Sequence, residues 1–183
     1  MNHYVDIVVK PDAEMRENVL LNKVYTKLHK ILCEQKSTDV GVSFPRYKIL
    51  IGNLIRIHGD EARLVELTAA SWLGGLSGYC DAGLVQSIPD NIAYRTVSRK
   101  QSNMTEAKLR RLIKRGSISP EAVKGYKAKM FQKGIDNPYL ELESASNGHK
   151  HRRYIQFGKL SPKPVGGQFD HFGLSKTATV PWF

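Results

Sequence analysis

The first 91 residues alternate between the hydrophobic periods of strands and of helices. The β-branched run from Tyr4 to Val9 predicts a strand that stops at Lys10-Pro11. Between Glu14 and Leu32, apolar residues recur every three or four positions, which predicts an amphipathic helix. Two short β-type runs, Val40 to Phe44 and Leu54 to His58, lie on either side of a polar, glycine-containing loop and predict a hairpin.

A second helix and a last strand complete this pattern. The helix is expected to begin after Asp60, a predicted N-cap, and to end among the glycines between positions 74 and 78. The apolar run from Leu84 to Ile88 then predicts a strand before Pro89. The order βαββαβ is that of a ferredoxin-like fold, an α+β scaffold. Proteins with this fold have many different functions, so the fold alone does not indicate one.

The second half of the chain is less regular. Its predicted elements are a strand at Ala93 to Ser98, a helix at Thr105 to Arg115 with Thr105 as N-cap, a helix from Ser119-Pro120 to Lys133, and strands at Tyr139 to Leu142 and His151 to Phe157. We therefore expect two domains, a ferredoxin-like domain at residues 1–91 and an α/β domain at residues 92–183.

Composition limits the class of protein. With 41% hydrophobic and 25% charged residues among 183, the chain has the composition of a globular protein, which excludes a mainly disordered or fibrous one. Its apolar runs fall far short of the ~20 residues that span a bilayer. The two cysteines are too few for a disulfide framework or a cysteine-rich zinc site. A cytoplasmic protein with reduced thiols and no membrane association is expected.

The positive charge is concentrated in one half. Residues 1–91 hold 10 Lys/Arg against 11 Asp/Glu, whereas residues 92–183 hold 18 against 6, a net charge of +12. A positive charge this concentrated in one half of the chain favours binding of a polyanion. A phosphate backbone, which releases counterions when it is bound, is the natural ligand. A solvated basic face that only aids solubility is the alternative. An anionic membrane surface is disfavoured, because no segment pairs a basic face with a broad Trp/Phe/Leu face.

The predicted helix at 105–115 carries the densest positive charge. Five cations occupy one broad side of it: Lys108, Arg110, Arg111, Lys114 and Arg115. Like charges at this spacing repel, so the arrangement favours a nucleic-acid ligand over a solvated face, which normally mixes signs. A helix-turn-helix in a DNA groove and a helix along a folded RNA both fit the spacing.

Three further features carry candidate chemistry. His29 lies late in the first helix beside the apolar stripe; it is either a structural residue or a general base for the 2′-hydroxyl of RNA, which needs no metal. His149 and His151 alternate on a basic strand, but without Cys or a carboxylate at ligand spacing a metal site is disfavoured. His151 can instead stack on a base. The segment from Ser144 to Gly148 joins two predicted strands with small hydroxyl residues, and an ordinary hairpin turn explains it at least as well as a role in a site.

Several short motifs, weak alone, become specific through their order and spacing. They are His3-Tyr-Val-Asp-Ile7, Lys27-Leu28-His29, Gly41-Val-Ser-Phe-Pro45, Leu54-Ile-Arg-Ile-His58, Tyr94-Arg95 with Val97-Ser98-Arg99 and Gln101, Gly173-Leu-Ser-Lys176 and Val180-Pro-Trp-Phe183. With them the chain resembles the CRISPR repeat-processing endoribonucleases of subtype I-F, or Csy type, over nearly its full length. The resemblance implies a ferredoxin-like domain followed by an RNA-binding domain whose arginine-rich helix lies along a repeat hairpin.

The resemblance also implies an activity. Such enzymes cut precursor CRISPR RNA on the 3′ side of a stem-loop, without metal or cofactor, by attack of a 2′-oxygen on its own phosphate, and they keep the product as a subunit of a surveillance complex. A non-catalytic hairpin-binding subunit, a helix-turn-helix DNA regulator and a metal nuclease are the rival functions.

By position, the resemblance gives roles to individual residues. His29 would deprotonate the hydroxyl, Ser144 would hold it, and Ser146 would lie near the phosphate. Arg99 and Gln101 would read bases at the foot of the stem, as their donor groups allow. His151 takes the place of a stacking aromatic, and Phe172 stands where the family pattern has tyrosine. On the helix, the family's groove-contacting and phosphate-contacting positions are Arg111, Lys114 and Arg115.

Overall fold

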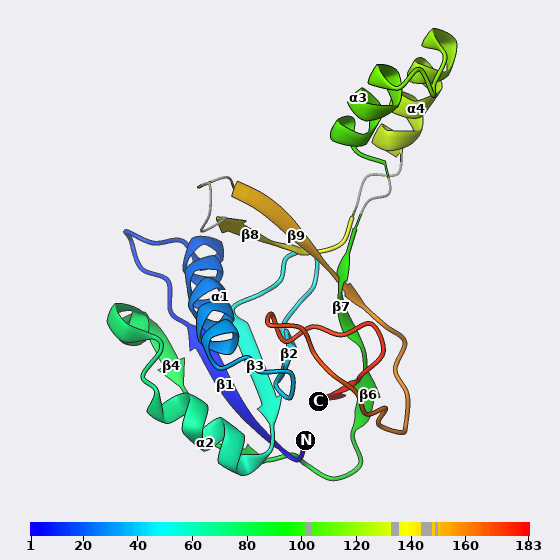
Figure 1. Ribbon diagram of the computed structural model, residues 1–183. Helices are drawn as coiled ribbons and strands as arrows, with labels where there is room; N and C mark the ends of the chain where they lie inside the picture. Colours follow the sequence, from blue (N-terminus) through cyan, green and yellow to red (C-terminus); the bar gives the residue numbers. More distant parts are fainter. Residues whose placement is uncertain (102–103, 133–135, 144–147, 149) are drawn as a thin grey trace.

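The computed structural model describes the chain from Met1 to Phe183 apart from residues 102–103, 133–135, 144–147 and 149. Within that part the protein is an α+β structure whose strand pairings are all antiparallel (Figure 1). The sequence predicted this class, and the structure confirms it.

The N-terminal half forms one sheet with two helices. Its elements are β1 (His3–Val9), α1 (Glu17–Glu34), β2 (Gly41–Ser43), β3 (Leu54–Gly59), α2 (Glu61–Ala69), the 3₁₀ helix η1 (Gly74–Tyr79), β4 (Cys80–Ala82) and β5 (Gln86–Ser87). The strand order is β2-β3-β1-β4, and β5 also pairs with β1. Strands β1 and β3 are therefore central, each with neighbours on both sides, and β3 is buried at every position.

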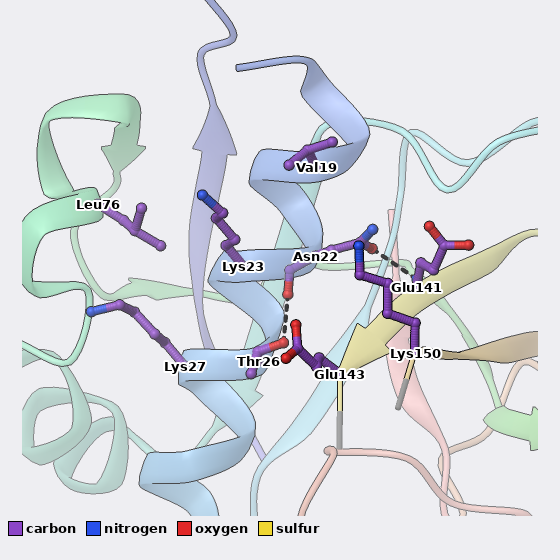
Figure 2. Close-up of a pocket in the computed structure, with 9 residues that line it drawn as sticks. All are labelled: Val19, Asn22, Lys23, Thr26, Lys27, Leu76, Glu141, Glu143 and Lys150. Atoms are coloured by element: carbon purple, nitrogen blue, oxygen red, sulfur yellow. Dashed lines mark hydrogen bonds between the residues drawn. The ribbon is translucent and has the colours of Figure 1, made fainter. Parts of the chain in front are cut away.

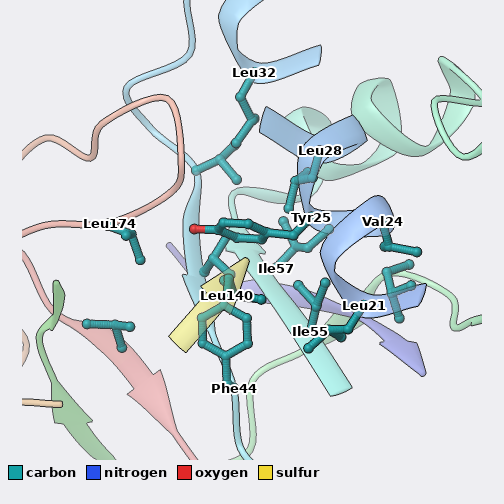
Figure 3. Packing of buried hydrophobic residues seen from close by; sticks show 14 of the residues in the cluster. Leu21, Val24, Tyr25, Leu28, Leu32, Phe44, Ile55, Ile57, Leu140 and Leu174 are labelled. Carbon is teal, nitrogen blue, oxygen red and sulfur yellow. The ribbon is translucent and has the colours of Figure 1, made fainter. Parts of the chain in front are cut away.

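One face of this sheet carries the hydrophobic core. The register places Val5 opposite Ile57 and Ile7 opposite Ile55, and because side chains alternate along a strand, these four point to the same side. They are buried against apolar side chains of α1, among them Leu21, Val24 and Leu28 (Figure 3). The helical stripe read from the sequence is thus the stripe that α1 buries.

The opposite face is polar and is covered by the end of the chain. Arg56 on β3 donates to both carboxylate oxygens of Asp6 on β1, at 2.7 and 2.8 Å, and to the main-chain oxygen of Phe183 at 2.8 Å. The guanidinium also lies 3.9 Å from the centre of the Phe183 ring. A buried arginine is stable here because each of its three nitrogens donates to an acceptor, two of them to a carboxylate.

Four details of the predicted N-terminal half are wrong, and the first is the end of the second helix, which lies at Ala69 and not among the glycines at 74–78. The last strand is two short strands, β4 and β5, because a bulge at 83–85 opposes three residues to two on β1 and leaves Leu84 82% exposed. Asp60 makes no side-chain cap; its carboxylate instead binds the N-terminal amine at 2.7 Å. Helix α1 begins three residues late because the Asp12 carboxylate accepts from the backbone of Glu14 and Met15 and holds them in a turn.

The C-terminal half contributes two smaller sheets. Its strands are β6 (Ala93–Arg95), β7 (Val97–Lys100), β8 (Tyr139–Glu143), β9 (Lys150–Phe157) and β10 (Val180–Trp182), paired as β7-β9-β8 and β10-β6. The predicted strand at 93–98 changes sheets at Thr96, whose carbonyl accepts from Gly158. The residues of one predicted strand therefore belong to two sheets.

Helices α3 (Glu106–Lys114) and α4 (Pro120–Gln132) form a hairpin that projects from the rest of the molecule (Figure 1). The predicted caps are confirmed: Thr105 Oγ1 accepts from the backbone N–H of Lys108, and Ser119 Oγ from that of Ala122. Gly116, at φ +65°, ends α3, where Ser117 N bonds Leu112 O and Gly116 N bonds Ile113 O. This pair of bonds is a Schellman motif.

Both halves contribute to one hydrophobic cluster. Leu140, Ile155 and Leu174 from the second half pack with Tyr25 and Phe44 from the first (Figure 3). Backbone bonds cross the same boundary: Val42 N donates to Gly173 O at 2.8 Å, and Phe169 N donates to Thr38 O at 2.9 Å. The division at residue 91, which the sequence predicts, therefore does not divide the core.

Candidate active site

His29 lies on the side of α1 next to the buried stripe. Its neighbour Leu28 and the residue one turn on, Leu32, are buried in the core. The helical spacing leaves the imidazole at the edge of that stripe, half-buried, where it lines a pocket. The sequence predicted this position at the margin of the apolar face.

A hydrogen bond selects the tautomer of His29. Its Nδ1 lies 2.9 Å from the main-chain oxygen of His171, and a carbonyl oxygen can only accept, so Nδ1 carries the proton. In the neutral ring Nε2 then holds the free lone pair. The imidazole is therefore arranged to accept a proton at Nε2.

The loop that supplies this carbonyl is itself held rigidly. The Asp170 carboxylate accepts from the backbone N–H of Phe172 and Leu174, at 2.9 and 3.0 Å. The hydroxyl of Tyr25 donates to the Phe172 carbonyl at 2.7 Å. Gly173 adopts φ +70°, and a Cβ there would overlap Val42, so this close approach requires glycine. The loop thus fixes both the His171 carbonyl and the ring of Phe172.

Phe172 orients the imidazole through stacking. The two rings are nearly parallel, 11° apart, with centroids separated by 3.4 Å. Phenylalanine supplies this surface without a hydroxyl, so His29 receives its orientation from the ring and from the His171 carbonyl.

The surroundings keep His29 neutral. Burial lowers its pKa below 6.5, the hydrogen bond to His171 opposes that shift, and the positive charge of Arg153 adds to it. Cys33, one helical turn on, places Sγ 3.5 Å from Nδ1 and 3.7 Å from Nε2. Burial raises the pKa of the Cys33 thiol, so this neighbour is uncharged at neutral pH. A neutral imidazole with a free lone pair can serve as a general base.

The pocket beside His29 has a volume of about 940 Å³ and brings together three of the predicted site residues: His29, His151 and Phe172. His151 comes from β9 and the other two from α1 and the 170–174 turn. The predicted residues Ser144 and Ser146 lie outside the described residues. The described residues on either side of them, Glu143 and Gly148, line the pocket.

The remaining predicted residues lie elsewhere. Arg99 is exposed on β7, and Gln101 follows directly after that strand. The cations of α3 are exposed on the projecting hairpin: Lys108, Arg110, Arg111, Lys114 and the C-cap residue Arg115. Within α3, Arg110 forms an ion pair with Glu106 at 3.2 Å. The predicted residues thus form a pocket group, a β7 group and a helix group.

A second pocket, of about 370 Å³, adjoins the first along α1 (Figure 2). Thr26 and Glu143 line both. Among the described residues, its lining carries three lysines, Lys23, Lys27 and Lys150, and two glutamates, Glu141 and Glu143, but no histidine or cysteine. It therefore offers charges of both signs but no imidazole or thiol.

Two residues of the first pocket were missed by sequence reasoning. Cys33 follows His29 by four residues, and that helical spacing was available as a signal. Arg153 alternates with Ile155 on β9, and both are buried. A charged residue at an inward-facing strand position was the signal for it.

Two kinds of feature are absent from the described part of the chain. No three His, Cys, Asp or Glu side chains there lie close enough together to hold a metal ion. In the same part, no helix has the length and apolar character to cross a membrane.

Comparison with known proteins identifies relatives along the whole chain. Residues 4–183 match the family model described as "CRISPR-associated protein (Cas_Csy4)". The chain is 36% identical over 184 residues to a protein of Escherichia coli (strain UTI89 / UPEC) named CRISPR-associated endonuclease Cas6/Csy4. It is 35% identical over 187 residues to a protein of the same name from Pseudomonas aeruginosa (strain UCBPP-PA14). Both matches cover all of this chain and all of the relative.

Proposed function

The chain belongs to the Csy4 family of CRISPR-associated proteins, and from this premise we propose that it is a metal-independent endoribonuclease. Its substrate is the stem-loop repeat of precursor CRISPR RNA, which it cleaves on the 3′ side of the stem. The curated relatives are named CRISPR-associated endonucleases, and this supports the class of reaction. The mechanism is argued from the residues of this chain.

The observation that carries the proposal is the neutral imidazole of His29, with its lone pair on Nε2, at the edge of a pocket. In the proposed step Nε2 takes the proton of the RNA 2′-hydroxyl, and the 2′-oxygen forms a bond to the adjacent phosphorus. The bond from phosphorus to the 5′-oxygen breaks, that oxygen takes up a proton from solvent, and the imidazolium of His29 returns its proton to solvent. The products are a 2′,3′-cyclic phosphate and a 5′-hydroxyl end, and no metal or redox partner is consumed.

Residues outside the pocket hold the RNA in this proposal. The exposed cations of α3 contact the phosphates and groove of the hairpin, Arg99 and Gln101 contact bases at the foot of the stem, and His151 stacks on the terminal pair. Ser144 and Ser146 are assigned to the 2′-hydroxyl and the phosphate. The net charge of +12 on residues 92–183 favours tight, salt-sensitive retention of the product in a surveillance complex in the cytoplasm.

The same proposal assigns a fold to each half. We infer a ferredoxin-like domain at residues 1–91, supported by the antiparallel order β2-β3-β1-β4 and the two helices between its strands. Residues 92–183 are assigned as the α/β RNA-binding domain with its arginine-rich helix, supported by the exposed cations on α3.

The test uses a repeat hairpin RNA in EDTA, with and without the 2′-hydroxyl just upstream of the cleavage point. The protein should bind both and cut only the first. His29→Ala should bind with unchanged affinity and lose cleavage by about 10²- to 10⁴-fold, the usual contribution of a general base. His3→Ala, at the start of β1 beside Ser87, is the matched control and should cleave normally.

The rival functions give different results in the same assay. A metal nuclease would lose activity in EDTA, and a non-catalytic RNA-binding subunit would bind without cutting either substrate. A helix-turn-helix regulator would prefer duplex DNA to the hairpin in a competition gel. Normal cleavage by His29→Ala would remove His29 from the mechanism.

A further inference from the structure

Among the described residues, Arg153 is a buried arginine without a buried counter-ion. The residue is 6% exposed, and within the same part of the chain its buried Nε has no hydrogen-bond partner. In the described part of the chain no carboxylate lies within ion-pair distance of it. A buried charge in this condition is costly unless an anion joins it.

The position of Arg153 relates it directly to the candidate base. The guanidinium carbon lies 3.5 Å from the centre of the Phe172 ring, and the imidazole of His29 stacks on the same ring at 3.4 Å. Two groups this close to the Phe172 ring cannot lie on the same face of it. The imidazole of His29 and the guanidinium of Arg153 therefore lie on opposite faces, roughly 7 Å from each other. All three side chains line the 940 Å³ pocket.

We propose that the guanidinium of Arg153 binds the phosphate at the cleavage point and stabilises its charge in the transition state. This inference rests on the proposed function and adds a catalytic residue to it. The ring of Phe172 fills the space directly between the two groups, so the RNA reaches them past the edge of that ring, with a 2′-oxygen bonded to His29 and a phosphate oxygen bonded to Arg153, each by a hydrogen bond of about 2.8 Å. As the 2′-oxygen attacks, negative charge grows on the phosphate oxygens, and a fixed cation there lowers the barrier.

The charges around the pocket agree with an anion beside Arg153. Burial is the main influence on its pKa and lowers it, while Tyr25 and Asp170 oppose that effect and Arg99 adds to it. Arginine nevertheless remains charged at neutral pH. Glu34 and Glu143 also line the pocket, but in the part of the chain that the structure describes neither pairs with Arg153. A phosphate would supply the missing acceptor.

A purely structural role is the alternative. Arg153 could serve only to support the ring of Phe172, in which case its loss would misplace His29 without affecting any phosphate. The two roles differ in one measurable property, the preference for an RNA that ends in a phosphate. Such an RNA resembles the product of the proposed reaction.

The experiment compares Arg153→Met with the wild-type protein. Methionine keeps the apolar stem of arginine and removes the charged guanidinium, and replacing a buried charge by an apolar residue is usually tolerated. Two quantities are measured: the single-turnover cleavage rate of the repeat hairpin, and the affinity for hairpins ending in a 3′-phosphate or in a 3′-hydroxyl. Arg152→Met is the matched control, because Arg152 is the adjacent residue on β9, is 51% exposed, and pairs with Glu141.

The wild type should bind the phosphate-terminated hairpin about tenfold more tightly than the hydroxyl-terminated one, as one charge-assisted bond allows. Arg153→Met should lose that preference and cleave about 100-fold more slowly, as when a transition-state donor is removed. Arg152→Met should keep both properties. If circular dichroism finds Arg153→Met unfolded, Arg153→Gln takes its place in the same measurements.

Two results would overturn the inference: a slow Arg153→Met protein that keeps its phosphate preference, or a wild type without such a preference. These results are distinct from failure of the proposed function. A wild type that does not cut the hairpin but prefers the terminal phosphate through Arg153 would retain the phosphate site and lose the nuclease.

Discussion

At the scale of single residues, the environment of His29 fixes its chemistry. The His171 carbonyl holds the proton on Nδ1, Phe172 holds the plane of the ring, and burial favours the neutral form. Sequence reasoning located His29 at the edge of the helical stripe. It could not locate the carbonyl, which lies 142 residues further along the chain and depends on tertiary contacts.

The lowered pKa of His29 predicts the pH dependence of cleavage. The base acts when unprotonated, so the rate should rise with pH up to the His29 pKa and remain level above it. Because burial places that pKa below 6.5, half of the maximal single-turnover rate should be reached below pH 6.5. Single-turnover rates from pH 4.5 to 8.5 measure this, and a rate still climbing between pH 7 and 8 would contradict it.

A second histidine, His58, predicts how stability depends on pH. It is completely buried on β3 with Nε2 2.8 Å from Ser43 Oγ, and burial lowers its pKa to about 3. The unfolded chain therefore binds a proton that the folded one does not, so stability is complete above pH 6.5 and falls as the pH drops toward 3. Between pH 7 and pH 5 this histidine should cost about 2 kcal/mol.

Urea unfolding at pH 7 and pH 5 tests this prediction. His58→Asn should flatten the dependence, whereas His151→Asn, at an exposed position, should leave it as in the wild type. Equal slopes in the wild type and His58→Asn would assign the acid sensitivity to other groups.

At the scale of elements, features that depend on neighbouring residues were predicted better than those that depend on distant partners. Both caps of the α3–α4 hairpin were read from Thr105 and Ser119, because capping is a local interaction between a side chain and nearby backbone. The bulge at 83–85 and the change of sheets at Thr96 depend on partner strands that are distant in sequence. No local pattern contains that information.

The end of α3 predicts opposite effects for two glycine substitutions. Gly116 has φ +65° and open space around its Cβ position, so Gly116→Ala should cost about 1 kcal/mol through backbone strain alone. Gly125 lies inside α4, also in open space, so Gly125→Ala should stabilise the hairpin by roughly 0.5–1 kcal/mol.

Amide hydrogen exchange in α3 and α4 measures these effects locally. Protection should fall about fivefold at the end of α3 in Gly116→Ala and rise in α4 in Gly125→Ala. Unchanged amide protection at the end of α3 in Gly116→Ala would mean that the turn adopts another conformation in solution.

The exposed cations of α3 predict the salt dependence of RNA binding. Arg111→Ala and Arg115→Ala should each weaken hairpin binding and reduce the slope of log affinity against log salt by about one contact. Lys10→Ala is the control, since Lys10 lies in the near-neutral half and pairs with Asp81. Titrations from 50 to 500 mM salt give the slopes, and an unchanged slope would place that arginine away from the RNA.

At the scale of the whole molecule, the two halves share a core. Leu140, Ile155 and Leu174 pack against Tyr25 and Phe44, and Phe183 covers the polar face of the N-terminal sheet. The change in net charge near residue 91 predicts where the ligand-binding surface begins, but charge carries no information about which apolar residues meet. Hence the sequence located the charge boundary, and only the structure located the shared core.

This shared core predicts that the protein unfolds in one step. The chain has two tryptophans, Trp72 in the first half and Trp182 in the second, so Trp72→Phe and Trp182→Phe each leave a fluorescent probe of the other half. Their urea transitions should share one midpoint after correction for the effect of each substitution on stability. Two separate midpoints would mean that the halves fold independently.

The projecting hairpin of α3 and α4 has a consequence for how such proteins diverge. It projects away from α1, the helix that carries His29 (Figure 1), so its surface can vary without disturbing the packing around that helix. Under the proposed function, substitutions on the α3–α4 helical hairpin can change which RNA repeat a family member binds, while its catalytic residues stay the same.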